Sequence, residues 1–177
     1  MDAQGVSGQV LDQLVRSEVL MLGGSVYVGA MARALKIEVS AVYGALGELV
    51  KLGWVLAPGD LQRRLTRPQV MPVGYQVWMS DGVADLSHDF ELVKGVVLSD
   101  VGRNTASVKV ATLRQKLRKQ HGLTLTEDEV QIDLRLMRGA GWITTHPMLG
   151  LHITSYAGAL SPGVPLAHWH LPNAQQP

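Results

Sequence analysis

Basic side chains form the most distinctive chemical pattern in this 177-residue chain, because guanidinium and ammonium groups bind phosphates and carboxylates. Residues 101 to 126 contain six basic residues and no acidic one, and residues 31 to 67 also carry a net positive charge. Acidic stretches elsewhere reduce the net charge of the whole chain to +1. The composition therefore excludes a polycation that coats nucleic acid by bulk charge, but it permits local binding to DNA and, equally, charge-paired assembly.

Other reactive residue types lack the spacing that their chemistry needs. Strand alternation would place His168 and His170 on one side, but no carboxylate lies nearby to complete a metal site. The glycines form no phosphate-binding fingerprint, no serine occupies a nucleophile elbow, and the chain has no cysteine. The uncharged stretch from 19 to 32 is too short to cross a bilayer. We therefore expect no catalysis, no cofactor, no metal and no membrane contact, and a cytoplasmic location.

An internal repeat organises the elements that must position the basic residues. Residues 42 to 66 recur at 130 to 154 with one constant offset. In each copy, apolar residues spaced i, i+4 and i+7 predict a helix face, a glycine predicts the helix end, and a tryptophan begins a strand. Hairpin turns are expected at 58 to 60 and at 147 to 150. The nine matched pairs are Val42 and Val130, Leu46 and Leu134, Leu49 and Met137, Gly53 and Gly141, Trp54 and Trp142, Val55 and Ile143, Leu61 and Leu149, Leu65 and Ile153, and Thr66 and Thr154.

Two further helices are predicted before each copy. In the first half, apolar stripes predict helices over residues 10 to 19 and 28 to 35. In the second half, helices are predicted at 90 to 98 and 108 to 120, and Thr126 is expected to cap a third helix with an acidic first turn. The chain is therefore predicted to be mainly α-helical with small β-hairpin wings, because three helices followed by a two-stranded hairpin occur twice.

The run MARALKIEVSAVYGAL at residues 31 to 46, continued at 49 to 55, resembles the winged helix-turn-helix superfamily of bacterial transcription regulators. The resemblance covers about residues 8 to 67. The second half resembles the same superfamily at 113–117, 130–143 and 151–154, with a longer connection between its second and third helices, and it is faintly similar to winged-helix proteins of Mu-like phages. The resemblance implies two tandem winged-helix domains, at 1–67 and 90–160, in a transcriptional or mobile-element regulator that binds double-stranded DNA.

In that superfamily the third helix enters the major groove and the wing follows the phosphate backbone. Ser40 and Tyr43 are the polar side chains that the third helix of the first domain would present to the groove. Gly44 and Gly47 stand where longer polar side chains would make bidentate base contacts, so sequence-specific reading is limited. The phosphate-binding residues that the resemblance implies are Arg33, Lys36, Arg63, Arg64, Arg67, Arg114, Arg118 and Lys119.

The second domain allows three interpretations. Its third helix would open with Glu127, Asp128 and Glu129, an arrangement that repels DNA. Either the second helix supplies the DNA-binding surface through its basic residues, or the acidic helix pairs with basic residues of another subunit. In the third interpretation the acids only cap their own helix and the basic helix is solvated.

The connecting and terminal segments indicate assembly. Residues 68–89 are predicted to link the domains, but Tyr75, Val77, Trp78 and Met79 make this segment too apolar for a free tether. We therefore expect residues 76 to 79 to pack between domains or across a dimer interface. The proline-rich tail at 161–177 cannot form a helix but fits an apolar groove of the same or another chain. A homodimer or a protein partner bound through these segments is therefore expected. Tandem winged helices also build adaptor subunits resembling chromosome-condensation accessory proteins, so a protein-interaction adaptor is the alternative function.

Overall fold

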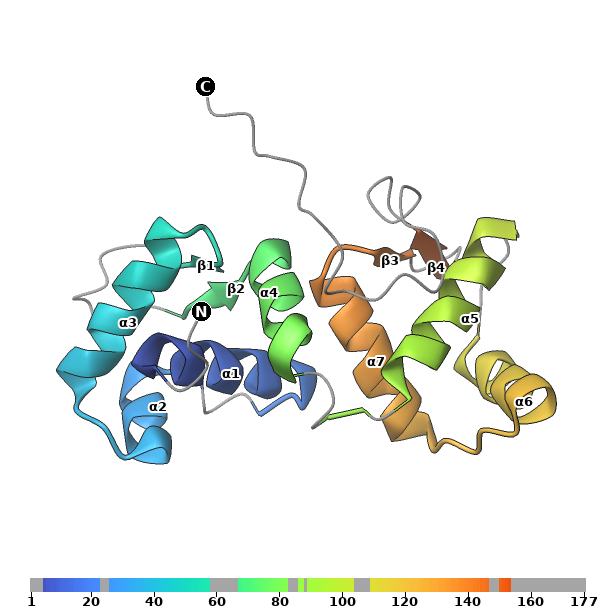
Figure 1. The fold of residues 1–177 in the computed structure, drawn as a ribbon, viewed down its shortest axis with the longest axis horizontal. Helices are drawn as coiled ribbons and strands as arrows, with labels where there is room; N and C mark the ends of the chain where they lie inside the picture. Colours follow the sequence, from blue (N-terminus) through green and yellow to red (C-terminus); the bar gives the residue numbers. More distant parts are fainter. Residues whose placement is uncertain are drawn as a thin grey trace, which may run out of the picture. The chain divides into compact units, whose positions relative to one another are not determined.

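The computed structural model describes residues 5–22, 26–57, 67–82, 86–87, 89–103, 109–146 and 150–153. These residues form seven α-helices and two two-stranded antiparallel sheets (Figure 1). The chain divides into two compact units, Met1–Leu86 and Ser87–Pro177. The predicted class, mainly helical with small antiparallel sheets, is confirmed for the described residues. The tail at 161–177 and its expected contacts lie outside them.

Three helices surround the core of the first unit. They are α1 (Val6–Val19), α2 (Val28–Leu35) and α3 (Val39–Lys51), and α1 packs against both of the others. The predicted apolar stripes form the contact, because Leu14 of α1 and Leu46 of α3 are both fully buried. Burial of these stripes is the main stabilising contribution to such helices.

The described residues of the second unit form three helices, and its hairpin agrees with the sequence prediction. α5 (Phe90–Arg103), α6 (Val110–His121) and α7 (Glu127–Gly139) precede β3 (Ile143–His146), which pairs with β4 (Gly150–Ile153). In the register of this pair, Ile143 lies opposite Ile153. The Thr126 hydroxyl accepts a bond of 3.2 Å from the Glu129 amide, and the Glu129 carboxylate accepts one of 2.7 Å from the Thr126 amide. This capping box confirms that Thr126 caps α7.

Matched glycines end α3 and α7 in the same way. Gly53 and Gly141 have φ values of +70° and +76°, which glycine adopts without a steric penalty. In both units the amide of the following tryptophan donates to the carbonyl five residues earlier, at 3.0 Å. This pattern is a Schellman motif, which satisfies the last helical carbonyls and turns the chain into the strand. The repeat therefore predicts both helix ends correctly.

The first sheet differs from the predicted hairpin. β1 (Val55–Leu56) pairs with β2 (Gln69–Val70), with Val55 opposite Val70, so the expected second strand at 61–66 is not the partner of β1. The reason is non-local, because the Val70 amide donates to the Glu18 carboxylate at 3.2 Å and the Val70 side chain is buried. The expected turn at 58–60 and the segment 61–66 lie outside the described residues.

A helix, α4 (Pro72–Gly82), occupies half of the segment predicted as a linker. The Tyr75 hydroxyl donates to Glu18 at 2.6 Å and the Trp78 indole N–H donates to Asp12 at 2.9 Å, so α4 is bonded to α1. Tyr75, Trp78 and Met79 are 5, 6 and 1% exposed. This segment is therefore a helix attached to the first unit and not a free linker, and the expected packing of residues 76 to 79 between domains or across a dimer stays a prediction.

A lysine lies in the aromatic part of the second core. The Nζ atom of Lys94, a residue only 1% exposed, is 5.5 Å from the ring centre of Trp142 and 5.9 Å from that of Phe90. Lys94 also forms an ion pair with Glu91 one turn earlier. The ring faces and the carboxylate together offset part of the cost of removing the ammonium group from water.

Candidate nucleic-acid interface

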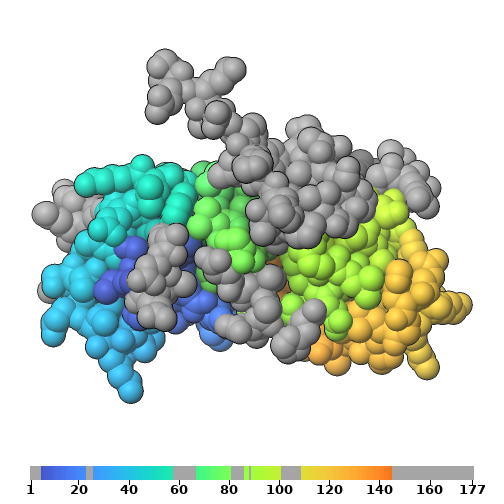
Figure 2. All heavy atoms as spheres, viewed as in Figure 1, coloured from blue at the N-terminus to red at the C-terminus, as the bar shows by residue number. Residues whose placement is uncertain are grey.

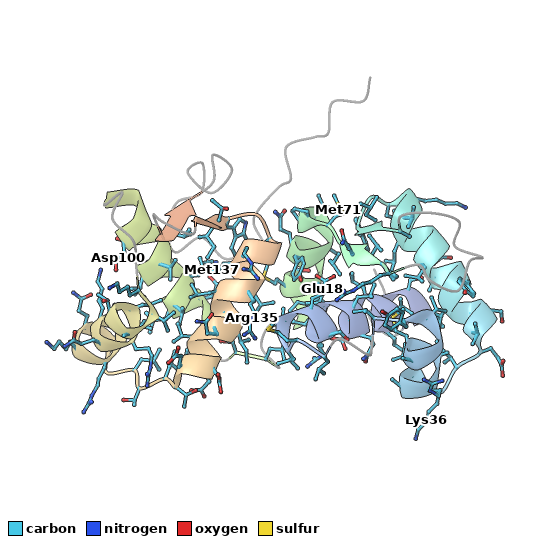
Figure 3. The ribbon with its side chains drawn as sticks, turned by 180° about the vertical axis from the view of Figure 1, so that it is seen from behind. Glu18, Lys36, Met71, Asp100, Arg135 and Met137 are labelled. Atoms are coloured by element: carbon cyan, nitrogen blue, oxygen red, sulfur yellow. The ribbon has the colours of Figure 1, made fainter. Side chains whose placement is uncertain are left out.

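Arg33 and Lys36 lie at the end of α2, where the chain turns into α3. Both side chains are exposed, and Lys36 projects from this corner of the unit (Figure 3). Lys36 has φ +55° and ψ +41°, and its amide donates to the Arg33 carbonyl at 3.3 Å. The left-handed conformation at Lys36 ends α2 sharply and places the two basic residues on one turn.

The outer face of α3 has few groups that could read bases. Because Val42, Leu46 and Leu49 are buried, Ser40 is left exposed and Tyr43 half-buried. A Cβ atom added at Gly44 or Gly47 would meet no atom within 4 Å, so no packing within the described residues requires glycine there. The exposed residue Glu38 adds a negative charge just before α3. This face therefore offers one hydroxyl and one phenol, which is little for base recognition.

Only part of the predicted wing cluster falls within the described structure. Arg67 is exposed and lies two residues before β2. Arg63 and Arg64 lie outside the described residues. The first unit therefore brings together Arg33 and Lys36, and presents Arg67 at the start of its sheet.

The basic residues of α6 divide into those held by the protein and those that face solvent. Lys116 forms an ion pair with Asp100 of α5, and the Nε atom of Arg114 donates to the carbonyl of Leu125 at 2.9 Å. Arg118 and Lys119 are exposed on the last turns of the helix. α6 lies on the outer surface of the second unit, where it is yellow in Figure 2. Its charge is therefore available to a ligand mainly through Arg118 and Lys119, together with the terminal nitrogens of Arg114, whose Nε atom alone is used in the bond to Leu125.

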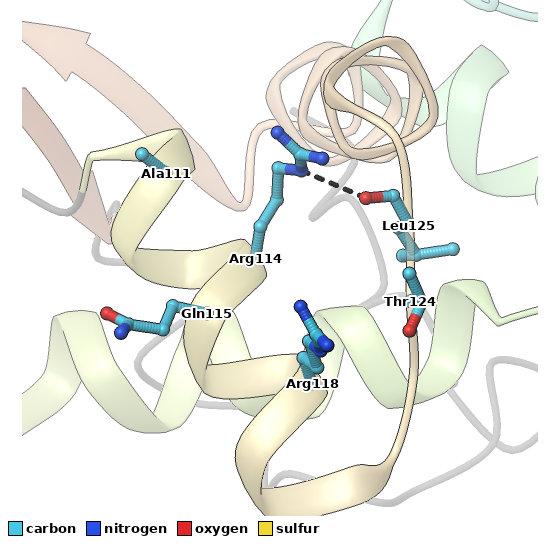
Figure 4. Close-up of a pocket in the computed structure, with 6 residues that line it drawn as sticks. All are labelled: Ala111, Arg114, Gln115, Arg118, Thr124 and Leu125. Atoms are coloured by element: carbon cyan, nitrogen blue, oxygen red, sulfur yellow. Dashed lines mark hydrogen bonds between the residues drawn. The ribbon is translucent and has the colours of Figure 1, made fainter.

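Two of these side chains border an open hollow. Arg114 and Arg118, one helical turn apart, point from α6 toward the 122–126 connection (Figure 4). The hollow has a volume of about 250 Å³, and Lys119 does not line it. Its other lining residues are Ala111, Gln115, Thr124 and Leu125. Charge counting along the sequence finds the arginines but not the hollow; their i, i+4 spacing is the signal that places them on one face.

Acidic side chains follow the hollow at the start of α7. Glu127 and Asp128 are exposed, and they complement the positive end of the helix dipole. Hydrogen bonds from the Thr126 backbone and side chain lower the pKa of Glu129. The second unit thus presents a positive surface on α6 followed by a negative first turn of α7.

A buried carboxylate lies one turn further along α7. Burial of Asp133, which is 1% exposed, raises its pKa to about 6. A hydrogen bond with the Ser87 side chain opposes this rise, while the charges of Asp89 and Glu129 add to it. The sequence does not reveal that Asp133 is buried, because an acidic residue on a helix that already has three acids in its first turn is expected to be solvated.

In the described part of the chain, no group of three or more His, Asp or Glu side chains could hold a metal ion. His168 and His170 lie outside that part. No described helix combines the length and the apolar character needed to span a bilayer.

Comparison with known proteins identifies no relative. No protein-family model matches this chain, and no curated protein and no solved structure matches it either. The likeness to winged helix-turn-helix regulators therefore rests on the residues quoted above and on the order of helices and strands in each unit.

Proposed function

We propose that this chain is a non-catalytic protein that binds double-stranded DNA through two winged-helix units and acts as a transcriptional or mobile-element regulator. The observation that carries the proposal is the basic surface of α6, where Arg114 and Arg118 border one hollow and Lys119 is exposed beside them. Clustered basic side chains on one helix are the usual electrostatic footprint of a protein that contacts DNA phosphates.

The first unit adds support through the order of its elements. α1, α2 and α3 are followed by a two-stranded sheet, the order expected of a winged helix. Arg33, Lys36 and Arg67 are exposed at the α2 end and before β2. Ser40 and Tyr43 would provide limited base or shape readout, so phosphate contacts supply most of the affinity.

This composition of the interface has a measurable consequence. Phosphate-dominated binding releases counterions, so affinity falls steeply with salt and depends little on DNA sequence. If the two units together neutralise about six phosphates, the slope of log K against log salt is roughly −5, at about 0.9 per phosphate.

The test is fluorescence anisotropy of the full chain with a labelled duplex at two salt concentrations. We expect the double variants Arg114→Ala/Arg118→Ala and Arg33→Ala/Lys36→Gly each to weaken DNA binding at low salt. Glycine replaces Lys36 because the backbone at that position has a left-handed conformation. Arg138→Ala is the control, because it removes an exposed charge about 16 Å along α7 from the first turn of that helix. Salt-insensitive binding, or equal losses in all variants, overturns the proposal.

A second function is favoured by one observation, the exposed carboxylates of Glu127 and Asp128 at the start of α7. Such a turn repels DNA and suits a basic protein surface, as in an adaptor subunit or a homodimer paired through charge. Sedimentation without DNA separates the two functions. Association that is lost in high salt and in Glu127→Gln/Asp128→Asn, together with no DNA binding, establishes the adaptor in place of the DNA-binding protein.

A further inference from the structure

We propose that the hollow between α6 and the 122–126 connection is a binding site for a single phosphate group, held by Arg114 and Arg118. The identity of the phosphate in the cell depends on the proposed function: if the chain binds duplex DNA, the hollow receives one phosphodiester of the DNA backbone. The site itself rests on the geometry of α6 and can therefore be tested without DNA.

Arg114 is oriented for this role before a ligand arrives. Its Nε–H donates to the Leu125 carbonyl at 2.9 Å, and the terminal nitrogens carry the four other N–H groups of the guanidinium. The bond fixes the plane of the guanidinium and joins α6 to the connection that follows it. An arginine held in this way loses less side-chain entropy on binding than a solvated one.

Arg118 supplies the second cation from the next turn of α6. It is exposed, and four residues of helix separate it from Arg114 by about 6 Å along the axis. Figure 4 shows both guanidinium groups on the side of α6 that faces Thr124 and Leu125. Two guanidinium forks that border one hollow can match the several acceptor oxygens of a phosphate, and the exposed Thr124 hydroxyl offers a further donor.

The surroundings favour a phosphodiester over a more highly charged ligand. The hollow is open to solvent, so a phosphate can enter while the groups esterified to it remain outside. Lys116 is already paired with Asp100, which leaves two arginines to supply the positive charge. The acidic first turn of α7, with Glu127 and Asp128, begins two residues after Leu125 and disfavours a polyphosphate.

The experiment is an NMR titration of the full ¹⁵N-labelled chain with inorganic phosphate at constant ionic strength, with sodium acetate in a parallel arm. We expect a saturable shift of the Arg114 Nε–H signal and of the 122–126 amides with phosphate, and at least about tenfold weaker binding of acetate. Arg118→Ala and Arg114→Lys should each weaken phosphate about tenfold or more, the size expected for a lost charge-assisted hydrogen bond. Arg114→Lys keeps the charge but lacks the fork.

Lys109→Ala, at the N-cap of the same helix, is the charge-matched control, because Lys109 is exposed and does not line the hollow. It should bind phosphate as the unchanged chain does. Acetate binding as tight as phosphate, a shift that never saturates, or one that the arginine variants leave unchanged overturns the phosphate site. Arg118 is exposed, so its variant tests the site even if Arg114→Lys perturbs folding.

A duplex-DNA arm separates the two claims. Arg118→Ala should lower the salt slope of DNA binding by about 0.9, the value for one phosphate. DNA binding with an unchanged slope and no phosphate shift refutes the hollow and leaves the proposed function standing. A saturable phosphate shift without DNA binding establishes the site for free phosphate and refutes the proposed function.

Discussion

The hydroxyl of Tyr75 donates a hydrogen bond of 2.6 Å to the carboxylate of Glu18, which joins α4 to the end of α1. The other oxygen of that carboxylate accepts the Val70 amide at 3.2 Å, so one side chain holds both β2 and α4. A carboxylate with two such donors specifies which strand pairs with β1 and how the chain continues from it. The first unit therefore extends beyond the hairpin into a fourth helix.

Tyr75→Phe should lower the free energy of unfolding of the first unit by about 1.5 to 3 kcal/mol, the range for a hydrogen bond to a charged group. Urea denaturation of the full chain measures this change. Tyr27→Phe is the matched control, because Tyr27 is 46% exposed and its variant should stay within about 0.5 kcal/mol of the unchanged chain. Equal stabilities of the two variants would show that the Tyr75 hydroxyl contributes nothing.

Two substitutions of glycine by alanine should change the stability of the first unit in opposite directions. A Cβ at Gly74 would lie 2.3 Å from the Trp54 carbonyl oxygen, so Gly74→Ala forces α4 away from β1 and should cost about 1 to 3 kcal/mol. A Cβ at Gly44 meets nothing within 4 Å, so Gly44→Ala should stabilise α3 by about 0.5 to 1 kcal/mol. Thermal unfolding of both variants measures these two changes. A Gly74→Ala variant as stable as the unchanged chain would contradict the close approach of α4 to the Trp54 carbonyl.

Lys36→Gly should separate stability from DNA binding. A lysine at φ +55° carries a steric cost of about 1 to 2 kcal/mol that glycine does not have. The variant should therefore unfold at higher urea concentration while binding duplex DNA more weakly, because it loses one exposed cation. Unchanged DNA affinity in this variant would remove Lys36 from the interface.

The buried carboxylate of Asp133 makes the second unit sensitive to pH. Its folded pKa of about 6 lies above the ordinary value of 3.8, so the folded state binds the Asp133 proton more tightly than the unfolded state does. The stability that this protonated carboxyl contributes is fully present below pH 3.8 and is lost as pH rises through 6. The loss amounts to about 3 kcal/mol at 1.36 kcal/mol per pKa unit. Hydrogen exchange of α7 peptides from pH 4 to 8, corrected for the intrinsic rate, measures it.

Asp133→Asn is the variant that isolates this effect, since the amide cannot ionise and can still bond with Ser87. It should flatten the pH dependence and stabilise α7 above pH 6. Asp128→Asn, at an exposed position on the same helix, should leave the pH dependence in place. The same slope in Asp133→Asn as in the unchanged chain would assign the pH dependence to another group.

Local patterns predict the helices well, because their information lies within a few residues. The i, i+4, i+7 spacing from Val42 to Leu49 identifies the buried face of α3, and Gly53 identifies its end. Both are matters of backbone geometry and side-chain periodicity. The same reasoning finds Thr126 as the cap of α7, because the capping box spans only four residues.

Pairings between distant residues are what the sequence does not reveal. The choice of Val70 as the partner of Val55 depends on Glu18, 52 positions before Val70. α4 has a signal in Pro72 and the spacing of Tyr75, Trp78 and Met79, but the surrounding prolines and glycines favour a linker.

The partners of the basic residues in the candidate site also cannot be predicted from the sequence. Counting charges identifies a basic α6, yet only the folded chain separates Lys116, which Asp100 holds, from Arg118, which faces solvent. The Leu125 carbonyl that orients Arg114 is likewise a partner that no charge count includes.

The salt dependence of duplex-DNA binding tests the central claim most directly. Anisotropy titrations from about 50 to 200 mM salt, the range over which phosphate contacts change affinity most visibly, should give a slope of roughly −5 for the unchanged chain. The slope should be about 0.9 shallower for Arg114→Ala/Arg118→Ala, which removes the one phosphate contact of the hollow, and nearly unchanged for Arg138→Ala. A slope near zero for the unchanged chain, or the same slope in all three proteins, would contradict DNA binding through the basic surface of α6.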